Sequence, residues 1–182
     1  MLHFVCHTKR HTSLVYSLIC IHTAYKIRGL NMSDFVQSSH VFLQNSSTTV
    51  DEVLAFLAKK SCELGVADDE QSVLDAFKAR EAEGTTGMMD GFAIPHAKCD
   101  AIKKATVLVV KFSGNVAWES MDKKPVRAAI ALFVPSKEAG TTHLQLLSKV
   151  AVLLMDEKFR ASVLESEDQA SIAALINKGL EA

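Results

Sequence analysis

The feature that most constrains the fold is a strongly apolar segment, Val126 to Val134, which lies between Pro125 and Pro135. Its length and its branched and aromatic side chains indicate a β-strand, and Pro135 ends it because proline has no N–H for a neighbouring strand. A strand that is apolar on both sides must be covered on both faces, as central strands of layered α/β domains are. We therefore expect a sheet with helices on each face.

Further strands are predicted before this segment in the sequence. Ala105 to Phe112 is also rich in β-branched residues and is bounded by Ser113 and Gly114, which predicts a second buried strand. Val41 to Leu43 predicts a short first strand, and Val116 to Trp118 predicts a short edge strand. About three strands therefore lie in the second half of the chain.

Amphipathic helices surround these strands. Thr49 and Glu52 form a capping box before apolar residues at helical spacing, and Asp68 opens a second helix that should reach Arg80 or Glu81. Three more helices are expected after Gly140: one from about Thr142, one over Glu157 to Leu164, and one from the capping box Ser166–Gln169 to Asn177. This order predicts an α/β fold, a three-layer α/β/α domain with a central mixed sheet of about four to five strands.

The composition argues against several classes of function. The chain has 20 basic and 21 acidic residues, so it lacks the excess positive charge of a nucleic-acid-binding protein. Its four cysteines are widely spaced and form no C-x-x-C pair, which argues against a zinc site. We expect reduced thiols in a cytosolic protein, with no bound metal and no direct membrane insertion.

The first residues differ from the rest of the chain. Met1 to Asn31 contains basic but no acidic residues, and its apolar run Leu14 to Ile21 is too short to span a bilayer as a helix. Met32 followed by Ser33 and Asp34 resembles a start of translation. We expect residues 1–36 to be an N-terminal extension, either disordered or the product of an upstream start codon, and residues 37–182 to form the domain.

Three histidines fall in the expected domain: His40, His96 and His143. His40 precedes the first strand without an obvious polar companion, which favours a packing or surface role. His96 follows Pro95 in an expected loop after a glycine-rich segment, where functional groups are often presented. His143 lies at a helix start, where the helix dipole favours anions. From the residues alone, a structural role and a functional role for His96 are about equally supported.

Three motifs resemble one family. They are Arg80-Glu81-x-x-Gly84-Thr85-Thr86-Gly87, the run Asp90 to His96 ending in Ala-Ile-Pro-His, and Thr142-His143-Leu144. Together they are similar to the type-2 enzyme IIA domains of the bacterial sugar phosphotransferase system, in the fructose and mannitol class. The segment Trp118 to Val126 also resembles the fructose branch. Ala97 replaces the usual glycine, and Met88-Met89 departs from the common loop.

The resemblance implies a relay function. His96 would accept a phosphoryl group from the histidine-containing phosphocarrier protein and donate it to a cysteine of a cognate IIB domain, which serves the membrane IIC permease. His143 and Arg80 correspond to the other active residues of the family. The chemistry requires no cofactor, because the phosphoryl group moves between two protein nucleophiles. Arg80 has the planar fork that suits phosphoryl oxygens, and the Thr86 hydroxyl or nearby amides could bind the same oxygens.

Other functions are weighed beside this one. A regulatory IIA of the nitrogen-related phosphotransferase branch would keep His96 but act by binding target proteins. A hydrolase with His96 as general base is disfavoured, because the chain lacks a G-x-S-x-G elbow and Cys99 would have to turn back toward the imidazole. A purely structural module is disfavoured by the combined motifs.

Overall fold

The computed structural model describes residues 35–138 and 142–181, apart from the side chains of Thr142 and His143. Most of the expected N-terminal extension lies outside these ranges. Phe35 and Val36, which we assigned to that extension, are buried in the core, and the Asn177 side chain binds the backbone N–H and carbonyl of Val36. Within the described ranges, no helix combines the length and apolar character needed to cross a bilayer.

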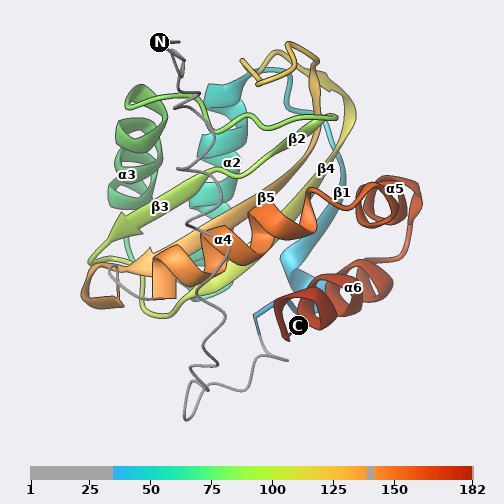
Figure 1. Ribbon diagram of the computed structural model, residues 1–182. Helices are drawn as coiled ribbons and strands as arrows, with labels where there is room; N and C mark the ends of the chain where they lie inside the picture. Colours follow the sequence, from blue (N-terminus) through green and yellow to red (C-terminus); the bar gives the residue numbers. More distant parts are fainter. Residues whose placement is uncertain (1–34, 139–141, 182) are drawn as a thin grey trace, which may run out of the picture. The chain divides into compact units, whose positions relative to one another are not determined.

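A five-stranded mixed sheet forms the centre of the domain (Figure 1). Its strands are β1 (Val41–Asn45), β2 (Phe92–Ala93), β3 (His96–Cys99), β4 (Thr106–Val116) and β5 (Val126–Pro135). The order across the sheet is β1-β4-β5-β2, and β3 also pairs with β5. Only the β4–β5 pair is antiparallel; β1 runs parallel to β4, and β2 and β3 run parallel to β5.

Helices cover both faces of this sheet, which confirms the three-layer α/β/α prediction. They are α2 (Val50–Glu63), α3 (Glu70–Ala82), α4 (Thr142–Leu153), α5 (Glu157–Glu165) and α6 (Gln169–Glu181), with 3₁₀ turns η2 (Ser38–His40) and η3 (Ser136–Glu138). Figure 1 shows α2 and α3 on one side of the sheet and α4 to α6 on the other. The Thr49–Glu52 capping box is present at the start of α2, as predicted.

Strand β5 occupies the buried central position that its composition predicts. All its residues except Arg127 are buried. Ala129, Ala131 and Phe133 pack in the cluster formed with α2 and α3. The alternate residues Ala128, Ile130 and Leu132 pack in the cluster formed with α4, α5 and α6. The period-2 alternation of a strand therefore supplies apolar side chains to both layers.

One strand prediction and one loop prediction were wrong. Val116 to Trp118 is not a separate strand, because β4 continues without a break to Val116. His96 does not lie in a loop but begins β3. Pro95 lacks an N–H, yet its carbonyl accepts from the Leu132 N–H at 2.9 Å, so pairing with β5 resumes directly after it.

The start of the last helix also differs from the prediction. The capping box was expected to begin at Ser166, but the Asp168 carboxylate accepts the Ser171 N–H at 2.8 Å and its hydroxyl at 2.6 Å. A carboxylate that accepts two donors stabilises a helix start better than the more weakly accepting Ser166 hydroxyl. Helix α6 therefore begins at Gln169.

The segment between α3 and β2 is pinned by a charged network. The Asp122 carboxylate accepts the Asp90 backbone N–H at 2.9 Å and the Lys124 N–H at 3.2 Å. Lys124 Nζ lies 3.2 Å from the Asp90 carboxylate, which also pairs with Arg160 of α5 at 3.0 Å. Asp90 has a φ of 55°, a left-handed conformation that these contacts hold in place.

Stability should depend on Asp122 at acid pH. The Asp90 backbone N–H is the main group that lowers the pKa of Asp122 to about 2. An unfolded aspartate titrates near 3.9, so the unfolded chain binds more protons at acid pH and the folded state loses stability as pH falls from about 4 to 2. Asp122→Asn should therefore show a flatter decline of the urea midpoint between pH 5 and 2. Equal slopes for wild type and variant would contradict this.

Gly87 should tolerate no side chain. A Cβ added there would lie 2.0 Å from the Glu119 carbonyl oxygen, a backbone atom that cannot rotate away. Gly87→Ala should lower the free energy of unfolding by about 3 kcal/mol, as overpacking does. The matched control is Gly114→Ala, where a Cβ meets no atom within 4 Å, and it should stay within about 0.5 kcal/mol of wild type in urea unfolding.

Candidate functional site

The site begins with a contact between a helix end and a strand start. Arg80 lies in the last turn of α3, and His96 is the first residue of β3, which packs against α3 (Figure 1). Arg80 Nε donates to His96 Nε2 at 2.8 Å, and Arg80 Nη1 donates to the Gly84 carbonyl at 2.8 Å. The Gly84 carbonyl therefore holds Nη1 of the guanidinium, while its Nε–H points to the imidazole.

The second ring nitrogen of His96 fixes the tautomer. His96 Nδ1 lies 2.9 Å from the Ile94 carbonyl oxygen, which can only accept a hydrogen bond. A neutral imidazole has one N–H, so Nδ1 carries it and the Nε2 lone pair accepts from Arg80. The His96 side chain is only 6% exposed. The ring is thus oriented by hydrogen bonds on both nitrogens.

A carboxylate beside Arg80 organises the adjoining segment. Both oxygens of Glu81 accept the Thr86 N–H at 3.1 Å, and Glu81 Oε2 accepts the Thr86 hydroxyl at 2.6 Å. Glu81 Oε1 also accepts the Trp118 indole N–H at 2.9 Å. Glu81 and Trp118 were not singled out from the sequence as site residues. The signal available was their place in the two quoted motifs.

The structure brings together some of the expected residues. Arg80 and His96 are in direct contact, and Thr86 lies in the same network with its hydroxyl directed to Glu81. The backbone of His143 belongs to the first turn of α4, but its side chain lies outside the described residues. His40, expected to have a packing or surface role, is 4% exposed, and burial lowers its pKa.

The arrangement suits a nucleophilic imidazole better than a thiol. Nε2 presents its lone pair toward a cation, which is the geometry needed to receive an anionic group. Cys99 lies at the other end of β3, and burial raises the pKa of its thiol. A raised pKa leaves little thiolate at neutral pH, so Cys99 is poorly suited to be a nucleophile.

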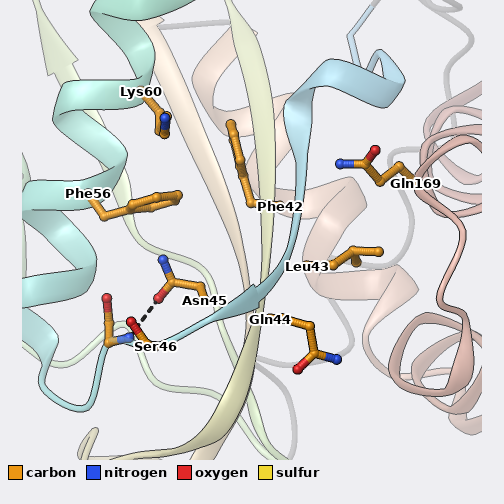
Figure 2. Close-up of a pocket in the computed structure, with 9 residues that line it drawn as sticks. Phe42, Leu43, Gln44, Asn45, Ser46, Phe56, Lys60 and Gln169 are labelled. Carbon is orange, nitrogen blue, oxygen red and sulfur yellow. Dashed lines mark hydrogen bonds between the residues drawn. The ribbon is translucent and has the colours of Figure 1, made fainter.

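A surface pocket lies at the opposite edge of the sheet, along β1 (Figure 2). Phe42 and Phe56 meet edge to face there, with ring centroids 5.2 Å apart, and Lys60 Nζ lies within 5.8 Å of both rings. Gln169 on its rim donates to the Val41 carbonyl at 2.5 Å. Arg80, Thr86 and His96, the expected phosphoryl-binding residues whose side chains the structure describes, do not line this pocket.

Comparison with known proteins finds a matching family model and several similar proteins. The family model described as phosphoenolpyruvate-dependent sugar phosphotransferase system, EIIA 2, matches residues 34–179. The fructose-specific EIIA component of Haloferax volcanii is 33% identical over 141 residues, covering 78% of this chain and 91% of that protein. A nitrogen regulatory protein of Bradyrhizobium diazoefficiens is 33% identical over 125 residues, covering 69% and 80%.

Solved structures agree on the fold. The nitrogen regulatory protein IIA-Ntr from Neisseria meningitidis superposes with a TM-score of 0.73 at 25% identity, covering 80% of this chain and 98% of that one. Enzyme IIAMTL from Escherichia coli, solved in complex with phosphorylated enzyme IIBMTL, gives 0.67 at 17% identity, covering 79% and 97%.

The family match spans most of the chain and includes the helix end that carries Arg80 and the strand that carries His96. By that match and by its curated relatives, the chain belongs to the EIIA type-2 family of the phosphoenolpyruvate-dependent sugar phosphotransferase system, whose members are phosphoryl-transfer components.

Proposed function

We propose that this chain accepts a phosphoryl group on Nε2 of His96 from the histidine-containing phosphocarrier protein and donates it to a cysteine of a cognate IIB domain, in the cytoplasm. The observation that carries this proposal is the oriented imidazole, with its proton on Nδ1 and its Nε2 lone pair turned to Arg80. The similarity to a fructose-specific component supports a role in fructose-class uptake through a IIC permease.

The proposed reaction balances without a cofactor. The Nε2 lone pair forms a bond to phosphorus while the N–P bond of the donor phosphohistidine breaks and returns its electron pair to the donor ring. His96 keeps its Nδ1 proton, so the phosphorylated ring is cationic and the Ile94 carbonyl stabilises it. The same positive charge makes Nε2 a good leaving group when the IIB thiolate attacks phosphorus. The phosphoryl group then passes to sulfur, and neutral His96 returns.

Arg80 has a part in both steps of the proposal. Its Nε–H now occupies the Nε2 lone pair, so the guanidinium must move from the ring to the arriving phosphoryl oxygens. A planar, permanently charged fork suits those oxygens in a loose transition state. His143, by the family resemblance, would be a second donor to them. The Thr86 hydroxyl now donates to Glu81, so it would bind a phosphoryl oxygen only after breaking that hydrogen bond.

A regulatory role is the second candidate. The similar proteins include nitrogen regulatory proteins, one of them 33% identical to this chain. A regulator would keep the acceptance step on His96 but would act by binding a target in one phosphorylation state. The two candidates therefore share the first transfer and differ in the second.

The His96→Ala variant should accept no phosphoryl group in a reconstituted relay of phosphoenolpyruvate, enzyme I and the histidine-containing phosphocarrier protein. It removes the only ring nitrogen proposed to attack phosphorus. The measurement is acid-labile radiolabel on the purified protein, with peptide mapping to locate it on wild type.

Label retained by His96→Ala would contradict the nucleophile assignment. His40→Asn provides the matched histidine control and should accept label like wild type, since His40 lies in η2 before β1. Adding fructose-class IIB domains separates the two candidates: loss of label from wild type to a IIB cysteine supports transport. Retention of label with every IIB domain encoded beside the gene supports regulation.

The Arg80→Lys variant should keep the positive charge but lose the planar fork and its Nε–H. We expect acceptance on His96 to slow on the order of 100-fold, the usual cost of removing one donor to transition-state charge. Rapid-quench single-turnover phosphorylation measures this rate, and far-UV circular dichroism checks the fold. An unchanged rate would remove Arg80 from the reaction.

A further inference from the structure

The Glu81 carboxylate, at the end of α3, accepts hydrogen bonds from two other segments of the chain. It is half-buried and accepts three donors: the Thr86 N–H, the Thr86 hydroxyl and the indole N–H of Trp118. Trp118 is itself only 4% exposed. Because both oxygens share the Thr86 N–H at 3.1 Å, the carboxylate fixes the direction of this backbone as well as its position.

Thr86 transmits this constraint to β2. Its carbonyl accepts the Ile94 N–H at 3.0 Å, and the neighbouring Met88 N–H donates to the Phe92 carbonyl at 2.8 Å. Gly87 forms a bridge with Ala93 between these two bonds. The segment that Glu81 anchors is therefore paired with β2 like an added strand, and it holds the backbone on which Ile94 lies.

Ile94 completes a continuous chain of hydrogen bonds to the imidazole. Its N–H is held by Thr86, and its carbonyl accepts the Nδ1–H of His96 at 2.9 Å. Pro95, which follows, has a fixed φ and adds no competing N–H. A neutral imidazole in water exchanges between its two N–H forms, and here the Ile94 carbonyl, which only accepts, favours the proton on Nδ1 together with Arg80 Nε–H, which only donates to Nε2.

We propose that Glu81 is a positioning residue that fixes His96 in the Nδ1–H tautomer, acting through Thr86 and Ile94. The neighbouring residues of α3 then divide the work: Arg80 contacts Nε2 directly, and Glu81 governs Nδ1 from a distance. The inference rests on the proposed function for its consequence, since only the Nδ1–H tautomer leaves the Nε2 lone pair for phosphorus.

The test is Glu81→Gln, compared with Glu83→Gln on the exposed side of the same helix end. Glutamine keeps the volume but offers one accepting oxygen, so its NH₂ group must face the donor of Thr86 or of Trp118. Nitrogen-15 NMR of histidine-labelled protein reports the tautomer of His96 directly, with the signal assigned by its absence in His96→Ala.

We expect wild type and Glu83→Gln to show the Nδ1–H form of His96. Glu81→Gln should show a measurable Nε2–H population and accept phosphate about tenfold more slowly, as misplacement of a reacting group does. A merely structural role would lower the urea midpoint without changing the tautomer, and that result would overturn the proposal.

A second variant and the independence of the NMR measurement from phosphorylation complete the test. If Glu81→Gln does not fold, Thr86→Val removes the hydroxyl that donates to Glu81 at 2.6 Å while keeping the shape of the side chain, and an unchanged tautomer and rate in that variant would overturn the proposal. The NMR measurement needs no phosphoryl donor, so it decides the role of Glu81 even if wild type accepts no phosphate. A tautomer shift without phosphorylation would therefore count against the proposed function alone.

Discussion

The structure depends on the burial of β5 on both faces. A strand at this position must present apolar side chains to two helical layers, and it must also supply backbone hydrogen bonds to neighbours on both edges. On one edge it pairs with β4 in antiparallel fashion. On the other it pairs with β2 and then with β3, in one unbroken register across Ile94 and Pro95. The backbone of His96 is therefore fixed by pairing with a strand that is buried on both faces, although His96 itself belongs to a short edge strand.

The features that could be predicted from sequence are those with a strong local signal. The run Val126 to Val134 has enough apolar residues to indicate a buried strand without help from its neighbours. Capping at Thr49 rests on a hydroxyl and a carboxylate three residues apart, and it is present in the structure. From these elements the α/β class and the three layers followed.

The strand pieces β2 and β3 could not be predicted in this way. Each is very short, and Pro95 between them gives a loop signal that the carbonyl pairing with Leu132 overrides. The same holds for the roles of Glu81 and Ile94. One acts through a side chain that bonds residues five and thirty-seven positions away, and the other through a backbone carbonyl, which leaves no mark in the sequence. Arg80 and His96 were assigned to one site only because the motifs resembled a family, and their direct hydrogen bond was not predicted.

The far edge of the sheet has a different consequence. Strand β1 is short, its Val41 carbonyl is taken by Gln169, and Gln44 adopts a left-handed φ of 57° that bends the backbone away from an extended path. An exposed strand edge otherwise offers a template on which a second molecule can add its own strand. Here the template is interrupted after a few residues. The far edge of the sheet therefore offers only a short run of extended backbone on which a strand of a second molecule could pair.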